Sequence, residues 1–226
     1  MIGSDEKPET DELDRKMMIR CIALSVRSGE KGEYPYGAVI RRASEIVSES
    51  INRVANEGDV TRHAEVVAIS GAQKVLGTVN LEDCVIYASA EPCAYCSYAI
   101  RESRLGRVVY SLRSPHMGGV SKWNVLTDED LSNAMPEVFE PPLEIIAGFM
   151  AYETERALLS WNPLMWGIVK MRGLLVAGPV ETMHARQQDK SPATWMRMLI
   201  TFCAPLCSTI SGADGEKHFC LELVQQ

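Results

Sequence analysis

The segment EPCAYC at residues 91–96 constrains this chain most, because it places two cysteines three positions apart directly after a proline. Proline is favoured at the start of a helix, so Cys93 and Cys96 are expected on one face of a helix that begins here. A disulfide, a redox pair and half of a metal site all use such a pair. The seven cysteines are an odd number, and the acidic N-terminus lacks the apolar run of a signal peptide. A reducing compartment is therefore expected, where this spacing favours metal binding or redox chemistry.

A second motif, HAE at residues 63–65, stands farther upstream at the start of another predicted helix. The strand predicted between the two helices is CVIYAS at 84–89. If that strand runs parallel to its neighbour, both helices begin at one edge of a sheet, and His63, Cys93 and Cys96 converge. One imidazole and two thiolates suit zinc, and catalytic zinc sites keep three protein ligands and leave the fourth position for water. A structural zinc site, or a capping histidine beside two buried thiols, is the alternative.

Glu65 distinguishes a catalytic site from a structural one. It lies two positions after His63, so it points to a different side of the helix and is not expected to be a fourth ligand. Two thiolates cancel the formal charge of Zn²⁺, which weakens the acidification of bound water. A nearby carboxylate would then accept the proton from water and deliver it to a leaving group.

The rest of the chain alternates short β-branched runs with segments of helical periodicity, which predicts an α/β fold with a sheet covered by helices. The region 52–62 is polar and is expected to be a loop. A break is expected near Pro163 in the last helical segment. The predicted strands are 36–42, 44–50, 84–89, 107–112 and 144–150, and the predicted helices are 13–29, 63–77, 93–106 and 152–171.

The order of these motifs resembles the cytidine deaminase-like superfamily. H-x-E followed by P-C-x-x-C is the pattern of its zinc deaminases, and PYGAVI, INRV and SRLGRVVYSLRS stand in family order. The resemblance is to the branch of guanine, cytosine and tRNA adenosine deaminases. It implies a three-layer α/β/α sandwich with a five-stranded mixed sheet, a Zn²⁺ cofactor, hydrolytic deamination and a homodimer. It also makes Glu65 the catalytic residue and His63, Cys93 and Cys96 the metal ligands.

Further residues are candidates for substrate binding. By the resemblance, Asn52 contacts the substrate base, and the backbone at Ala64 and Ser89 lines the pocket. Tyr36 and Trp123 are candidates for stacking on a base, although aromatic residues are also common in cores. The chain departs from the family where members often read PFGA and TLEPC, since it has Tyr36 in the first motif and Ser89 at the start of the second.

These features predict a zinc-dependent hydrolytic deaminase acting on a free nucleobase or related heterocycle, guanine- or cytosine-like, with release of ammonia. The alternatives are a tRNA adenosine deaminase subunit and a non-catalytic zinc-stabilised scaffold. Nucleic acid is not expected as a partner, because the chain has 30 acidic and 23 basic residues and a net charge of −7. The material for a basic rim near the zinc helix is limited to Arg101, Arg104, Arg107 and Arg113.

The domain organisation follows from where these patterns begin and end. Residues 1–11 are expected to form an acidic tail, 12–173 the zinc deaminase domain, and 174–226 a C-terminal appendage. No stretch is long and apolar enough to predict a membrane span, so a cytoplasmic location is expected.

Overall fold

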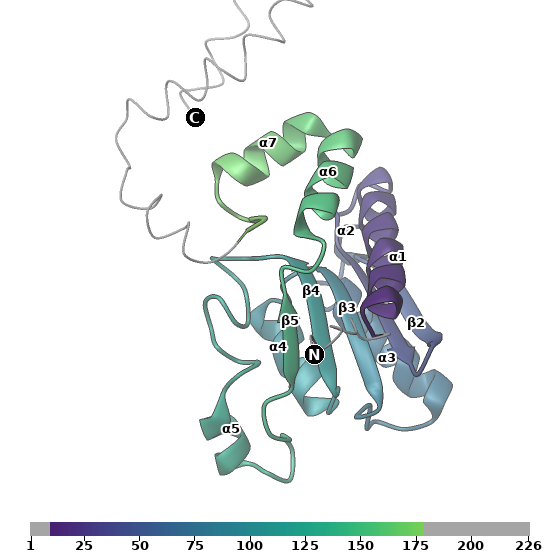
Figure 1. The fold of residues 1–226 in the computed structure, drawn as a ribbon, viewed down its shortest axis with the longest axis vertical. Coiled ribbons are helices and arrows are strands. Elements are labelled where there is room, and N and C mark those ends of the chain that lie inside the picture. Colours follow the sequence, from purple (N-terminus) through teal and green to yellow (C-terminus); the bar gives the residue numbers. More distant parts are fainter. Residues whose placement is uncertain (1–9, 179–226) are drawn as a thin grey trace, which may run out of the picture. The chain divides into compact units, whose positions relative to one another are not determined.

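The computed structural model describes residues 10–178, and its centre is a five-stranded sheet in the order β2-β1-β3-β4-β5 (Figure 1). Residues 1–9 of the predicted acidic tail and residues 179–226 of the predicted appendage lie outside the described residues. The strands are β1 (Gly37–Arg42), β2 (Glu45–Ile51), β3 (Cys84–Ala90), β4 (Arg107–Leu112) and β5 (Glu144–Ala147).

Strand β1 sets the direction of its neighbours. It pairs antiparallel with β2 on one side and with β3 on the other, so β2 and β3 run in the same direction. Strands β4 and β5 continue the sheet in parallel. The ends of β2, β3 and β4 therefore meet at one edge of a mixed sheet, and the helices that follow β2 and β3 begin near that edge.

The helices cover both faces of the sheet, which confirms the predicted three-layer sandwich. Helix α1 packs on β1 and β3, and α6 packs on α1 and β4. Helix α3 packs on β1 and β2 and contacts α4, so these two helices form the opposite layer, behind the sheet in Figure 1. The helices are α1 (Thr10–Glu30), α2 (Val54–Glu57), α3 (Ala64–Leu76), α4 (Ala94–Glu102), α5 (Glu129–Ala134), α6 (Ala151–Trp161) and α7 (Pro163–Met171).

The core follows the alternation of side chains along each strand. Val39 and Tyr87 belong to the buried cluster beneath α1. Their neighbours Ile40 and Ile86 belong to the cluster on the other face, with the small residues of α3. Both faces of the central strands are thus apolar, as expected for strands covered on both sides.

Three local features differ from the sequence prediction. The predicted loop 52–62 contains the short helix α2, and α5 was not predicted. Asp128 caps α5 by accepting a hydrogen bond from the Leu131 N–H at 3.0 Å. The helix of the cysteine motif begins at Ala94, so Cys93 is its N-cap and Pro92 stands one residue before the cap. The expectation that Cys93 lies within the first helical turn was therefore wrong.

The ends of the described region extend beyond the predicted domain limits. Helix α1 begins at Thr10, and Val176 pairs with Arg113 through two backbone hydrogen bonds of 2.9 Å. Leu175 is buried against the core cluster of α6 and α7. Within residues 10–178, no helix combines the length and the apolar character that a membrane span requires.

A buried ionic cluster joins α1 to the sheet. The carboxylate of Asp14, which is 3% exposed, accepts hydrogen bonds from Arg41 at 3.2 Å and from Arg107 at 2.5 Å. It also accepts a hydrogen bond from the Tyr87 hydroxyl, which in turn accepts one from Arg41 at 2.6 Å. One carboxylate thus links α1 to β1, β3 and β4.

Replacing this carboxylate is expected to destabilise the fold strongly. Asp14→Ala would leave Arg41 and Arg107 without their common counter-ion, and removal of one partner of a buried ion pair typically costs about 3–5 kcal/mol. Urea denaturation of the full chain measures the loss. The matched control Glu12→Ala, an exposed carboxylate in the same helix, should change the free energy of unfolding by less than about 0.5 kcal/mol. Equal effects of the two variants would contradict the assignment.

Candidate active site

The three predicted zinc ligands converge at the starts of α3 and α4. His63 is the N-cap of α3 and Cys93 the N-cap of α4, both with extended backbone, and neither side chain makes a capping hydrogen bond. The His63 Nδ1 atom lies 3.6 Å from the Cys93 Sγ atom and 3.4 Å from the Cys96 Sγ atom. All three ligand atoms lie within 4.8 Å of one another. The fold therefore assembles one imidazole and two thiols from two separate helix starts.

The protonation of this set fits a divalent cation. The pKa of Cys93 is lowered to about 4, first by the hydrogen bond from the Cys96 thiol and then by His63. The pKa of Cys96 is raised, because it is the partner that keeps the proton. One sulfur of the pair is thus readily deprotonated beside a helix N-terminus, which favours negative charge. A zinc ion would displace the thiol proton of Cys96 and neutralise both thiolates, so the donor set suits zinc.

Glu65 lies beside the ligands without belonging to them. Its buried carboxylate accepts a hydrogen bond from the Cys96 thiol at 3.5 Å. Burial raises the pKa of Glu65 to about 7, and the neighbouring Cys93 sulfur contributes to the rise. A carboxyl group with a pKa near neutrality is able both to accept and to give back a proton. The arrangement places such a group next to the three ligands.

Asn52 is held in one orientation by a residue that the sequence analysis did not identify. Its side-chain amide nitrogen donates to the Glu33 carboxylate at 2.9 Å, and its backbone N–H donates to the Tyr36 carbonyl at 3.0 Å. Glu33 is itself buried and also accepts from the backbone N–H groups of Ala55 and Asn56 at 3.1 and 2.7 Å. Because a carboxylate only accepts, Glu33 fixes the amide nitrogen of Asn52 on its side.

The remaining predicted substrate residues divide into two groups. Ala64 and Ser89 are buried, and the Ser89 hydroxyl accepts from the Gly37 N–H at 3.0 Å. Tyr36 packs against the buried cluster that contains Ala64, and its pKa is raised to about 12 by burial and then by the charge of Glu65. Trp123, in contrast, is 57% exposed on a loop and its ring faces Lys122. Its stacking role stays a prediction.

Glu91, the first residue of the EPC motif, holds the loop that lies against Cys93. Its buried carboxylate accepts the backbone N–H groups of Val120 and Ser121 at 2.9 and 2.6 Å, which holds the loop that follows β4. In this loop, Gly118 forms a bridge with Cys93. A Cβ atom at Gly118 would lie only 2.2 Å from the Glu91 carboxylate. A side chain at position 118 would therefore displace the buried Glu91 carboxylate, and the loop lies directly against one of the ligands.

Tyr95 also contacts the ligand set, although the sequence analysis assigned it no role. Its ring packs edge-on against the His63 imidazole with centroids 5.6 Å apart. This contact limits rotation of the imidazole and helps to aim the Nδ1 atom at the sulfurs.

Loss of one thiol is expected to abolish zinc binding. Purified protein should carry about one zinc per chain, and Cys93→Ala should carry almost none and unfold at a lower temperature, because ligation contributes to folding. The matched control is Cys84→Ala, a buried cysteine at the start of β3, which should keep its zinc. Metal analysis of both variants provides the measurement. Full zinc occupancy in Cys93→Ala would refute the ligand set.

Comparison with known proteins agrees with this geometry. Residues 11–112 match the family model of the cytidine and deoxycytidylate deaminase zinc-binding region. The tRNA-specific adenosine deaminase of Aquifex aeolicus is 41% identical over 116 residues, which are 51% of this chain and 77% of that protein. The guanine deaminase of Bacillus subtilis is 40% identical over 99 residues, which are 44% of this chain and 61% of that protein.

A solved structure supports the same relationship. It comes from a study of A-to-I editing by tRNA:A34 deaminases at the wobble position of transfer RNA, and it superposes with a TM-score of 0.57 at 26% identity. The match covers 63% of this chain and 99% of that one. The chain therefore belongs to the cytidine and deoxycytidylate deaminase family of zinc-binding proteins.

Proposed function

We propose that this protein deaminates adenosine within tRNA by hydrolysis, with release of ammonia. The observation that carries the proposal is the similarity to the Aquifex aeolicus tRNA-specific adenosine deaminase, of which the match covers 77%. The tRNA-specific adenosine deaminase of Bacillus subtilis, of which the match covers 85% at 34% identity, supports it further. The free nucleobase predicted from the sequence is thus the second candidate rather than the first.

In the proposed reaction, three residues would bind the metal and a fourth transfers protons. His63, Cys93 and Cys96 would hold zinc, which when bound supplies the Lewis acidity that makes water a nucleophile near neutral pH. Glu65 accepts one proton from the attacking water and passes it to the ring nitrogen, and it then transfers the second water proton to the departing amine. The carbon–oxygen bond forms first, and the exocyclic carbon–nitrogen bond breaks when ammonia leaves. Burial raises the pKa of Glu65 and so favours its protonated form, which supports a group that gives the proton back.

Asn52 is the proposed contact to the substrate base. Glu33 holds one side of its amide, so the Oδ1 atom and the second N–H are left for an edge of the base. Tyr36, Ala64 and Ser89 are proposed to line the pocket around it.

The sequence analysis disfavoured nucleic acid as a partner, and the relatives do not support that expectation. Of the four arginines considered there for a basic rim, three make contacts within the fold. Arg101 is buried and donates to backbone carbonyls, including that of Val125 at 3.0 Å. Arg104 pairs with Glu140 at 2.8 Å, and Arg107 belongs to the buried ionic cluster of α1. An RNA strand would therefore need Arg113, which makes no side-chain ion pair among the described residues, or cations elsewhere.

Guanine deamination is the second candidate, because the guanine deaminase of Bacillus subtilis matches this chain at 40% identity. That match covers a smaller share of the relative, 61% against 77% for the adenosine deaminase. The homodimer and the cytoplasmic location stay predictions.

A direct substrate comparison tests the proposal. Zinc-loaded protein should release ammonia and form inosine with an RNA hairpin that presents adenosine in its loop, and should release little or none with free guanine, cytosine or adenine. Turnover of guanine without turnover of the hairpin would favour the second candidate. Zinc binding without ammonia release from any substrate would favour the non-catalytic scaffold.

The role of Glu65 is tested in the same assay. Glu65→Gln keeps the size of the side chain but cannot accept the proton, so turnover should fall about 100-fold or more while zinc content stays unchanged. The matched control Glu102→Gln changes an exposed carboxylate of α4 and should retain normal turnover. Equal turnover in the two variants would show that another group carries the proton.

The hydrogen bond from Asn52 to Glu33 generates a further prediction. A glutamine at position 33 donates as well as accepts, so Glu33→Gln would no longer fix the Asn52 amide in one orientation. KM for the RNA substrate should rise about tenfold, the equivalent of one charged hydrogen bond, with a smaller change in kcat. The control is Glu102→Gln, an exposed carboxylate of α4, which should leave KM unchanged. An unchanged KM in Glu33→Gln would exclude this positioning role.

A further inference from the structure

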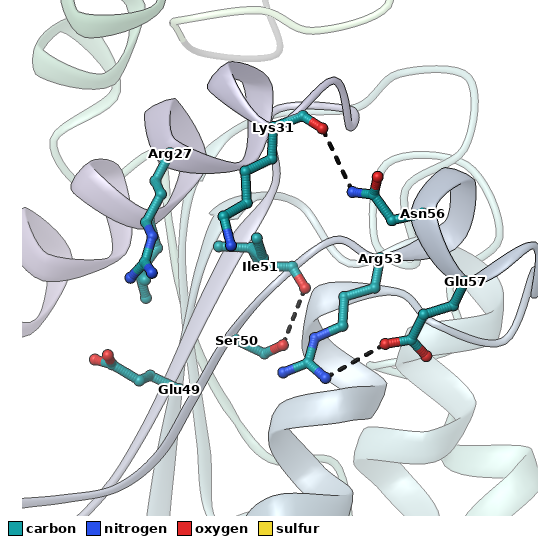
Figure 2. A pocket seen from close by; sticks show the side chains of 9 residues that line it. Arg27, Lys31, Glu49, Ser50, Ile51, Arg53, Asn56 and Glu57 are labelled. Atoms are coloured by element: carbon teal, nitrogen blue, oxygen red, sulfur yellow. Dashed lines mark hydrogen bonds and ion pairs between the residues drawn. The ribbon is translucent and has the colours of Figure 1, made fainter.

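A hollow of about 550 Å³ lies between the C-terminal end of α1 and strand β2, apart from the zinc ligands and Glu65. Figure 2 shows Arg27 in the last turn of α1 and Lys31 directly after it, with both side chains extending toward β2. Arg53 and Asn56, from the segment that follows β2, line the opposite side. The hollow is therefore bordered by three cationic side chains from two separate segments.

The two carboxylates in the lining are already paired with arginines. Glu49 accepts two hydrogen bonds from Arg20, at 2.7 and 2.5 Å. Glu57 lies 3.4 Å from Arg53 and 3.1 Å from Arg62. Arg27 also contributes to lowering the pKa of Glu49, after Arg20. The lining nonetheless holds three cationic side chains against two carboxylates, and both carboxylates are paired with arginines outside it, Arg20 and Arg62.

Apart from Arg53, the cations of the lining are Arg27 and Lys31. Among the described residues, neither forms an ion pair through its side chain. The Lys31 carbonyl accepts a hydrogen bond from the Asn56 side-chain amide at 3.4 Å, which joins the end of α1 to the segment after β2. A local excess of positive charge in a chain of net charge −7 attracts anions specifically to this place.

The hollow is next to the proposed base contact in the chain. Ile51 and Arg53 line it, and Asn52 stands between them. Glu33 holds the Asn52 amide and also the backbone N–H of Asn56, which lines the hollow. The end of α1 and the segment after β2, which carry the cations and the residue proposed to contact the base, are thus joined by hydrogen bonds.

We infer that this hollow binds a phosphate group of a polynucleotide substrate, with Arg27 and Lys31 as its principal ligands and Arg53 at its border. The inference rests on the proposed function. A guanidinium and an ammonium group together suit a phosphate, since the first offers a planar pair of donors and the second a point charge. A free base carries no phosphate, so the hollow would contribute to binding only when the base belongs to a nucleotide chain.

The first test is RNA binding by the full-length, zinc-loaded protein at increasing salt. The double variant Arg27→Gln/Lys31→Gln should bind the adenosine hairpin about tenfold more weakly, and the slope of log K against log salt should become shallower by about one unit. The control Lys74→Gln/Arg156→Gln removes the same charge from exposed positions on α3 and α6 and should match the wild type. Equal affinities and equal slopes in the two double variants would overturn the inference even if the hairpin is deaminated.

A second measurement tests the phosphate site independently of the proposed function. Inorganic phosphate, compared with chloride at matched ionic strength, should raise the unfolding temperature of the wild type and of the control but not of Arg27→Gln/Lys31→Gln. This readout requires no RNA and no turnover. If the hairpin neither binds nor reacts, the proposed function fails, and the phosphate effect alone decides the inference. Absence of a phosphate effect in the wild type would overturn it.

Discussion

The position of β1 between β2 and β3 is the constraint on which the site depends. Because β1 runs antiparallel to both neighbours, β2 and β3 run in the same direction and end at the same edge of the sheet. Each is followed by a helix on the same face, and the two helix starts carry His63 and Cys93. Binding sites commonly form at the edge of a sheet where the carboxyl ends of parallel strands meet. In this chain, that edge brings together residues from two motifs that lie far apart in the sequence.

Burial determines the chemistry of the groups that meet at this edge. Glu65 is removed from water, so its carboxyl group holds a proton near neutral pH far more readily than an exposed glutamate does. The pKa of Cys93 is lowered and that of Cys96 is raised, so one of the two sulfurs loses its proton readily, and a zinc ion would displace the other proton. The structure thus combines a site for a cation with an adjacent group that can carry a proton. Neither function would be available from the same residues on an exposed helix.

Much of the fold and the ligand set could be predicted from the sequence, because both have strong local signals. Alternating apolar runs locate all five strands, and the spacing of HAE and PCAYC locates the ligands. The start of α4 was misplaced because Pro92 suits a first helical position, whereas the structure uses Cys93 as the cap and places Pro92 before it. Helix α5 was missed because it is only six residues long and lies in a polar stretch.

The residues that position the site could not be predicted, because their roles depend on contacts between distant segments. Glu33 acts on Asn52 from the end of α1, and Glu91 holds a loop that begins more than twenty residues later. Arg101 follows the general pattern of cations near a helix end, yet it is buried and donates to carbonyls across the loop after β4. No spacing in the sequence distinguishes such residues from exposed charges. Only the fold shows that they are buried.

The central claim is that His63, Cys93 and Cys96 form an open, three-ligand zinc site. X-ray absorption spectroscopy of the zinc-loaded protein tests it most directly, because sulfur and nitrogen ligands differ in distance and scattering. The account predicts two sulfurs at about 2.3 Å and two lighter atoms at about 2.0 Å, of which one is the nitrogen of a single imidazole and the other is not from the protein. Three or more sulfurs, two imidazoles, or no sulfur at all would contradict it.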